Sequence, residues 1–451
     1  MAVLLVLGST FSGSGPGQPR IVADDGLEAV PYGSATTSLV VSEASLLTLQ
    51  PPPAEMPPLP VPAAPARPQE LAADLTEDAA EEQPATWLGE PWHRLGPVTG
   101  EYLYAGEVFS NAHGGIATQG ATRYRGLLEL SLRLDTGAAN WWQGGEVYAY
   151  LLQAHGTTLT PRFVGDSQLY SNLDTGPKPQ DLTELGEFWY QHKFLDETLL
   201  VRVGRQDANE DFAYADLAAE FLNSSFATLP NIPMPFWPFQ TLGVTALYEV
   251  SDKLRLGGGM YDHGRDKFQW WAATEERGLF LLGQADCRLG GGGSSPPPTL
   301  VRTGLWYASS DTWAVDGSGV FEGNYGVYGT VDQICYRESG SEVQGLGVFV
   351  QLSWAPPDRN QVEWNYGAGL VYRGLLKNRD DDVLGAGFTL LAFSPVEREW
   401  SGRENENAIE LFYQLRTSDW SVLQPDLQYI VSPNGLERDA LAVGVRWEMN
   451  L

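Results

Sequence analysis

The sequence predicts an all-β protein, a 16-stranded antiparallel transmembrane β-barrel with a long third loop folded into it and a disordered N-terminal extension before it. Three observations support this prediction. The 451 residues include 50 Gly, 15 Trp and 19 Tyr but only 5 Met and 2 Cys, which is typical of many short strands and tight turns. From Gly100 onward, segments that alternate apolar and polar residues recur, and their connections are alternately short and long. No apolar run approaches the ~20 residues of a membrane helix, so these segments can span a membrane only as a closed barrel.

Residues 1–97 are predicted to lie outside the barrel. Met1–Leu7 is apolar and is followed by small residues, so we favour a signal-peptide remnant at residues 1–19 over an incidental apolar N-terminus. Residues 20–97 are rich in Pro, Ala and Glu, and the run Pro51–Pro68 favours extended polyproline II. We expect a disordered periplasmic linker, and we favour a solvated tail over one that binds a periplasmic partner.

Residues 98–451 are predicted to form the barrel. The clearest segment is Tyr124–Asp135, in which four leucines alternate with Arg125, Glu129, Ser131 and Arg133. One such segment could also belong to a soluble sheet, but the number of segments is even and no long helix between them could cover a large sheet. The sixteen segments begin near Tyr102, Tyr124, Gly145, Leu185, Leu199, Thr241, Leu254, Leu279, Leu300, Tyr325, Leu346, Glu363, Leu384, Ile409, Leu423 and Leu441.

The connections predict which ends of the strands share a rim. Long loops on one rim and short turns on the other are the pattern of an outer-membrane barrel, with both barrel ends on the short-turn rim. Aromatic residues at strand ends, such as Trp141, Trp142, Trp354, Trp364 and Trp447, favour interfacial girdles. The short connections are Thr136–Trp142, Leu195–Glu197, Ser251–Asp252, Gly290–Pro298, Glu338–Val343, Gly374–Asp382 and Thr417–Ser421. The long ones include Asn111–Arg123, His155–Thr183, Ala208–Phe239, Asp262–Arg277 and Ser309–Asn324.

The third long connection, Ala208–Phe239, is predicted to fold into the barrel and narrow it. Its Pro-rich end cannot pair inside a sheet, and loops longer than ~12–15 residues are usually functional or disordered. Its many aromatic residues argue against disorder. Sixteen strands leave an aqueous channel, which this loop can narrow.

Five motifs in the barrel region resemble the carbohydrate-selective porins of the OprB type. They are GRQDANEDFAYAD at Gly204–Asp216, FLNSSF at Phe221–Phe226, YGVYGTVDQ at Tyr325–Gln333, PDLQYIVSPNG at Pro425–Gly435 and DALAVGVR at Asp439–Arg446. The resemblance covers roughly Trp92 to Leu451. It implies a sixteen-stranded porin that gives facilitated diffusion of glucose and similar sugars across the bacterial outer membrane of a Gram-negative cell. The chain departs from the family in ending on Leu451 rather than an aromatic residue, and in its acidic, Pro-rich extension.

A sugar-selective pore needs hydrogen-bonding charged groups and aromatic faces, because a sugar carries many hydroxyls and an apolar C–H side. Residues beside the third long loop are the predicted pore constriction: Arg133, Glu129, Arg202, Asp207, Asn209, Glu210 and Asp211, with Phe236 and Trp237 as stacking faces. Alternation also directs Arg125, Arg255, Arg302, Arg373, Arg416, Arg446, Glu146, Glu187, Glu410 and Asp426 into the lumen. For any single one of these residues, a structural ion pair is the favoured interpretation, and a β-bulge would reverse an assignment.

Other classes of function are less well supported. The net charge of −29 disfavours nucleic acid, and no basic patch compensates for it. The five histidines lack metal-ligand spacing and there is no G-x-S-x-G motif, so we expect neither an enzyme nor a cofactor or metal. A general, cation-leaning porin without sugar preference remains the alternative. The expected partners are sugars in transit and outer-membrane lipid, and both a monomer and a homo-oligomer such as a trimer stay open. Cys287 and Cys335 are expected to be free thiols. One strand lies between the two strands that carry them, which places them about 10 Å apart at ~4.8 Å per strand, and a disulfide needs Cα atoms within ~7 Å.

Overall fold

The computed structural model of the protein describes residues 93–176, 180–263, 278–290, 299–341 and 343–450. The predictions for residues 1–92 lie outside the described residues. Within the described part of the chain, no helix is long and apolar enough to cross a membrane.

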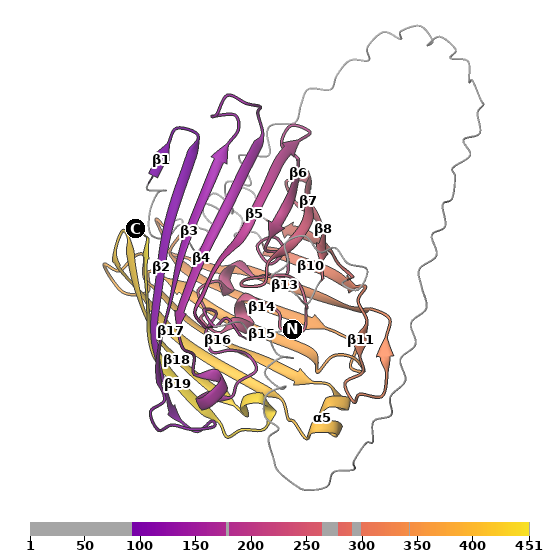
Figure 1. Cartoon of the computed structure of the whole chain (residues 1–451). Coiled ribbons are helices and arrows are strands. Elements are labelled where there is room, and N and C mark those ends of the chain that lie inside the picture. Colours follow the sequence, from indigo (N-terminus) through magenta and orange to yellow (C-terminus); the bar gives the residue numbers. More distant parts are fainter. Residues whose placement is uncertain (1–92, 177–179, 264–277, 291–298, 342, 451) are drawn as a thin grey trace, which may run out of the picture. The chain divides into compact units, whose positions relative to one another are not determined.

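Sixteen long antiparallel strands of the described chain form one closed barrel (Figure 1). Each strand pairs with the next one along the chain. The last, β19, pairs with β2, and β9 pairs with β10 across a partly undescribed connection, so no edge is left open. The strands are β2 (Val98–His113), β3 (Thr122–Asp135), β4 (Gly145–Gly156), β5 (Leu182–Phe194), β6 (Leu199–Gln206), β7 (Thr241–Ser251), β8 (Leu254–Asp262), β9 (Leu279–Leu289), β10 (Thr299–Ala308), β13 (Asn324–Arg337), β14 (Gly345–Trp354), β15 (Val362–Arg373), β16 (Val383–Phe393), β17 (Glu406–Ser418), β18 (Ser421–Val431) and β19 (Ala440–Asn450).

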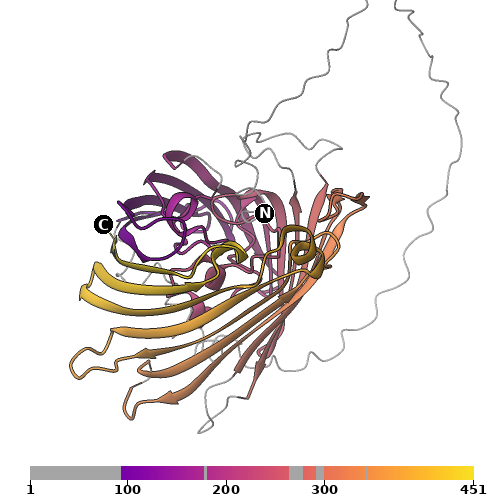
Figure 2. The same cartoon turned by 90° about the horizontal axis from the view of Figure 1, so that it is seen from below.

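The sixteen-strand prediction is confirmed, and the observed strands begin within four residues of the predicted positions. Figure 2 shows the strands from below, following one another in the order of the sequence. β19 ends, and β2 begins, on the rim that carries the short turns. The long-loop rim carries a two-stranded hairpin, β11 (Thr312–Trp313) and β12 (Val320–Phe321), and the helix α5 (Pro395–Ser401).

The predicted linker extends too far at its C-terminal end. Residues 93–95 form a short strand, β1 (His93–Leu95), which pairs with the start of β2, with Leu95 opposite Val98. The two residues between them, Gly96 and Pro97, form the turn, and Gly96 has a φ of 62°, a conformation that glycine adopts without strain. Local hairpin pairing therefore orders the chain before residue 98.

The alternating pattern separates a lumen face from a lipid face in each strand. In β18, the side chains of Val422, Gln424 and Asp426 are buried, whereas those of the alternating Leu423 and Leu427 are exposed. An apolar outer face and a polar inner face are what a barrel needs in lipid. The two cysteines, Cys287 in β9 and Cys335 in β13, are free, as expected.

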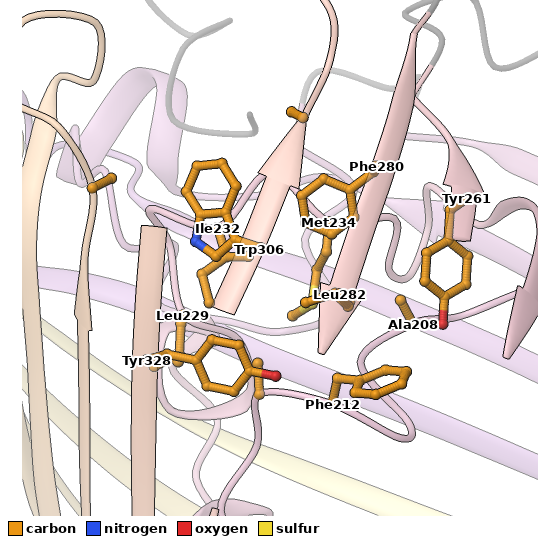
Figure 3. Packing of buried hydrophobic residues seen from close by; sticks show 13 residues of the cluster. Ala208, Phe212, Leu229, Ile232, Met234, Tyr261, Phe280, Leu282, Trp306 and Tyr328 are labelled. Carbon is orange, nitrogen blue, oxygen red and sulfur yellow. The ribbon is translucent and has the colours of Figure 1, made fainter. Parts of the chain in front are cut away.

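The lumen is not empty, because the third long loop folds into it. We call residues 207–240 loop L3; it contains the 3₁₀ turn η5 (Asp216–Ala218) and the short helix α4 (Ser224–Ala227). One buried cluster joins apolar residues of L3 to the inner faces of β8, β9, β10 and β13 (Figure 3). Its labelled L3 members are Ala208, Phe212, Leu229, Ile232 and Met234, and its wall members are Tyr261, Phe280, Leu282, Trp306 and Tyr328.

Two strand glycines allow this close approach. A Cβ atom on Gly257 of β8 would lie 2.8 Å from the ring of Phe212, and one on Gly387 of β16 would lie 2.7 Å from the ring of Phe221. Both rings belong to L3 and are fully buried. Glycine at these wall positions therefore leaves the space that the loop's aromatic anchors occupy.

Candidate functional site

Two wall carboxylates hold the backbone of L3. Asp332 of β13 accepts hydrogen bonds from the N–H groups of Asp216 and Leu217 at 3.1 and 3.0 Å. Glu410 of β17 accepts from the N–H groups of Leu222 and Asn223 at 2.6 and 2.9 Å. These inward carboxylates are anchors for a loop that would otherwise leave buried N–H groups unpaired. For Glu410, the expected partner was an opposite charge in the wall, whereas its observed partners are backbone N–H groups of L3.

Wall amides satisfy further backbone groups of the same loop. Gln284 of β9 accepts from the N–H of Ala213 at 3.0 Å and donates to the carbonyl of Asp211 at 3.2 Å. Gln351 of β14 donates to the carbonyl of Ser225 at 2.5 Å. L3 is therefore fixed to strands on several sides of the barrel and is part of the pore wall rather than a free flap.

A second loop also folds inward, which the sequence pattern did not predict. We call residues 157–181 loop L2; all but residues 177–179 are described. The N–H groups of Ser167 and Gln168 donate to Glu406 of β17, on the far side of the β19–β2 seam, at 2.8 and 2.9 Å. The N–H of Asn172 donates to the carbonyl of Leu222 in L3 at 2.7 Å. The length of L2 is similar to that of L3, and this similarity was a signal in the sequence that L2 also folds into the barrel.

All nine residues of the predicted constriction line one cavity of ≈ 900 Å³. Walls of the cavity come from the strands and from loops L2 and L3. The nine residues are Glu129 and Arg133 of β3, Arg202 of β6, and Asp207, Asn209, Glu210, Asp211, Phe236 and Trp237 of L3. The structure thus brings together side chains separated by about a hundred positions in the sequence.

Two arginines stand on the strand side of this cavity. Arg202 donates from Nη1 to Oδ2 of Asp211 at 2.7 Å and from Nε to Oε1 of Gln191 at 3.2 Å. Arg133 donates to Oε1 of Glu146 at 3.2 Å. The side chain of Arg202 is 10% exposed and that of Arg133 is 37% exposed, so Arg133 offers more of its guanidinium group to a solute.

Asp207 closes the base of L3. Its two carboxylate oxygens accept from the N–H of Asn209 at 2.7 Å and from the N–H of Trp237 at 2.6 Å, which joins the start of the loop to its end. The N–H of Ala208 donates to the carbonyl of Pro235 at 2.9 Å across the same base. Burial raises the pKa of Asp207 to about 8, and the neighbouring Glu210 adds to the shift.

The remaining acidic and aromatic residues have different surroundings. Glu129 accepts a hydrogen bond from the hydroxyl of Tyr150. Burial is the largest influence on Glu210 and raises its pKa. Phe236 lies edge-on to Phe239, with 6.5 Å between ring centroids, and Trp237 packs against buried residues of β2–β5. Phe236 and Trp237 both contribute to the cavity surface.

The cavity is lined by more charged groups than the nine predicted residues include. Acidic side chains outnumber basic ones by twelve to seven among its lining residues. Arg302 of β10 is paired with Asp216 of L3 at 2.8 Å and with Asp332 at 2.9 Å, and Arg255 of β8 is paired with Asp286. Alternation along the strands predicts that the side chains of Arg255, Arg302 and Arg446 point into the lumen. It does not predict which acidic residues pair with them. Lys253, Arg288, Glu448 and Tyr214 also line the cavity and were not singled out.

A metal-binding arrangement is not evident in the described part of the chain. Among these residues, no group of three or more His, Cys, Asp or Glu side chains lies close enough to hold a metal ion. The lining residues offer hydrogen-bond donors and acceptors, charges of both signs and apolar surface.

Comparison with protein families decides the identity of the chain. The sequence model of the family "Carbohydrate-selective porin, OprB family" matches residues 119–451. The chain belongs to this family. Members of the OprB family are channels, and the function of this chain is that of an outer-membrane porin for carbohydrates.

Individual relatives are distant in sequence. Porin B of Pseudomonas aeruginosa is 21% identical over 393 residues, which cover 76% of this chain and 85% of that protein. A putative porin of Acinetobacter baylyi, QuiX, is 20% identical over 388 residues, which cover 76% of this chain and 87% of that protein. Among solved structures, the high-pH structure of Pseudomonas putida OprB matches the fold with a TM-score of 0.70 and 20% identity, covering 79% of this chain and 94% of that one. The low-pH structure matches with a TM-score of 0.52.

Proposed function

We propose that this OprB-family porin selects sugars at a constriction between loop L3 and the wall formed by β3–β6. One observation carries the proposal. The ≈ 900 Å³ cavity is lined by Arg133 and Arg202 from the strands and by the acidic residues Asp207, Glu210 and Asp211 from loop L3. Arg202 and Asp211 contact each other directly at 2.7 Å, so a solute passes beside this pair rather than between its members. It can accept hydrogen bonds from Arg133, whose side chain is 37% exposed, and donate to acidic side chains of the loop.

Such a site suits a neutral, hydroxyl-rich solute. Each sugar hydroxyl exchanges a hydrogen bond to water for one to protein, which contributes only ~0.5–1.5 kcal/mol net, or up to ~3 kcal/mol with a charged partner. Phe236 and Trp237 add apolar surface for the C–H side of the ring. Weak binding of this kind favours passage, since a tightly held solute would not leave. Transport of this kind requires no covalent chemistry, cofactor or metal.

The orientation follows from the rims. We place the long-loop rim outside the cell and the short-turn rim in the periplasm, as in outer-membrane barrels generally. Because β2 begins on the short-turn rim, we place the N-terminal extension, which precedes this strand, on the periplasmic side. The exposed apolar residues of the strands face lipid, and both a monomer and a trimer are compatible with this arrangement.

A planar-bilayer recording tests the proposed site. We expect glucose to reduce single-channel current in a concentration-dependent manner in the wild type, and Arg133→Ala or Arg202→Ala to weaken this block several-fold. The alanine variants should also shift ion selectivity toward cations, since each removes one positive charge from the lumen. Arg337→Ala, at the short-turn end of β13 and outside the cavity lining, is the matched control. Unchanged glucose block in both variants would place sugar recognition elsewhere.

A general, cation-leaning porin is the second candidate. The excess of acidic over basic side chains in the cavity, twelve to seven, favours cations over anions among small ions. Measurement of the K⁺/Cl⁻ permeability ratio together with glucose block separates the two. Cation preference with no glucose block supports the general porin, whereas glucose block supports the sugar-selective one.

A further inference from the structure

Four planar side chains form one row along the wall behind the constriction. Arg133 of β3 pairs in register with Tyr148 of β4, and Tyr148 pairs with Trp189 of β5. Arg202 of β6 pairs with Gln191, two positions along the same face from Trp189. Cross-strand neighbours on one face of a sheet are within contact distance, so the four side chains stack laterally.

The distances show a continuous stack. The Cζ atom of Arg133 lies 4.6 Å from the ring centroid of Tyr148, and that of Arg202 lies 4.5 Å from the ring of Trp189. Between them, the rings of Tyr148 and Trp189 are stacked with 4.7 Å between centroids and 30° between planes. Both guanidinium groups are therefore within the range of cation–π attraction, which is ≲ 6 Å from the ring centroid.

The stack leaves neither ring free to bind a sugar by its face. Tyr148 lies between Arg133 and Trp189, and Trp189 lies between Tyr148 and Arg202. The two residues are only 7% and 3% exposed. Trp189 lines the cavity, but Tyr148 does not. Their large buried rings therefore act on the neighbouring guanidinium groups rather than on a solute.

The outer ends of the stack are also fixed. Glu146 accepts from Arg133, and Gln191 and Asp211 accept from Arg202. Trp189 donates from its indole N–H to Glu187 at 3.1 Å, and the same Glu187 oxygen accepts from the N–H of Asp207 in L3 at 3.1 Å. Each guanidinium group thus lies over an aromatic ring and is also held by hydrogen bonds to neighbouring polar side chains.

We propose that Tyr148 and Trp189 are positioning residues for sugar selection, because their stacked rings hold the guanidinium groups of Arg133 and Arg202 at a fixed spacing and orientation toward the lumen. The inference rests on the proposed function, in which those two arginines contact the sugar. A rigid donor fork loses less conformational freedom per hydrogen bond than a mobile one. Loss of either ring leaves the charge in place but releases its orientation.

The test compares removal of each ring with its conservative replacement. Tyr148→Leu and Trp189→Leu should raise the glucose concentration for half-block of single-channel current by about three- to tenfold, the effect expected from loss of a cation–π contact of moderate strength. Tyr148→Phe and Trp189→Phe retain a ring and should stay within about twofold of the wild type. The K⁺/Cl⁻ permeability ratio should be unchanged in all four variants, because no charge is altered. Wild-type block by glucose in Tyr148→Leu and Trp189→Leu would overturn the proposal.

A double-variant cycle separates positioning from general structural damage. Tyr148→Leu should have no further effect on glucose block in an Arg133→Ala background, and Trp189→Leu none in an Arg202→Ala background. Additive losses would contradict the proposal. If a leucine variant fails to insert, Arg133→Lys and Arg202→Lys give the same test, since lysine keeps the charge but lacks the planar group that stacks; wild-type block in both would contradict it.

The outcomes distinguish this inference from the proposed function. Absence of glucose block in the wild type would remove the proposed sugar site itself. Glucose block that Arg133→Ala and Arg202→Ala weaken, but that the leucine and lysine variants leave unchanged, would remove only the positioning role of the two rings.

Discussion

Arg202 and Asp211 join the barrel wall to loop L3. The guanidinium Nη1 of Arg202 in β6 donates to Oδ2 of Asp211 at 2.7 Å, and both side chains are 10% exposed. The pair therefore has two roles, since it fixes the loop near its start and sets the position of one donor in the proposed constriction. A charge pair removed from water in this way is sensitive to the loss of one partner.

Asp211→Ala should destabilise the folded barrel and weaken sugar block. Removal of one partner of a buried ion pair costs ~3–5 kcal/mol because the other charge is left unpaired. Thermal unfolding in detergent measures the first effect, and glucose titration of single-channel current measures the second. Glu197→Ala is the matched control, because its pair with Lys193 spans 3.8 Å and its side chain is 64% exposed. Equal effects of the two substitutions would contradict the account of Arg202 and Asp211.

Glu410→Ala should loosen L3 without altering the loop's own sequence. The substitution removes the acceptor of two loop N–H groups, those of Leu222 and Asn223, and it lies on β17, which carries neither of the two arginines of the proposed site. We expect noisier open-channel current and faster cleavage of L3 by added protease. Glu399→Ala, at an exposed position of α5, should change neither. A quiet channel with an intact loop in Glu410→Ala would show that this anchor is dispensable.

Ion selectivity should depend on pH through Asp207. Burial raises the pKa of this carboxyl to about 8, and it faces Glu210 and Asp211 of L3 and Glu187 of β5. Because the folded state binds this proton more tightly than the unfolded chain does, its stabilising contribution is present at low pH and is lost as pH rises through about 8. Ionisation over the same range adds negative charge to the lumen.

Reversal potentials in a KCl gradient test this prediction. The K⁺/Cl⁻ permeability ratio of the wild type should rise between about pH 6 and pH 9, on either side of the raised pKa. Asp207→Asn should show a smaller rise. The same rise in the wild type and in Asp207→Asn would assign the titration to another group.

Deletion of residues up to about 90 should leave a folded, conducting barrel. The composition of this segment cannot bury a core, and the barrel of residues 93–450 closes through its own strand pairs. Heat-modifiable mobility on gels and channel conductance measure the outcome. Failure of the shortened protein to insert would give the extension a role in assembly.

Much of the fold could be predicted because a period of two is a local property. The alternation of apolar and polar side chains in β18 or β19 can be recognised within about ten consecutive residues. The same alternation predicted that Arg133 and Arg202 point into the lumen. Loop L3 was recognisable because it interrupts this pattern for too long and is too aromatic to be disordered.

The remainder depends on contacts between distant residues. Nothing in the local sequence shows that Glu406 binds L2 or that Glu410 binds L3, since each contact closes only when the barrel does. Irregularities limit alternation as well. In β5, Glu184 and Glu187 both face inward although three positions separate them, because a bulge lies between them. Stacking of Tyr148 on Trp189 likewise requires the strand register.

The most direct test of the central claim is the single-channel conductance of a protein whose L3 is shortened. Asp207 and the contact of Ala208 with Pro235 hold the two ends of the loop together, so residues 213–233 can be replaced by a short Gly-Ser link without opening the barrel. We predict higher conductance than the wild type and loss of glucose block in a protein that keeps its heat-modifiable mobility. Wild-type conductance with glucose block intact would place L3 outside the solute path and contradict the account.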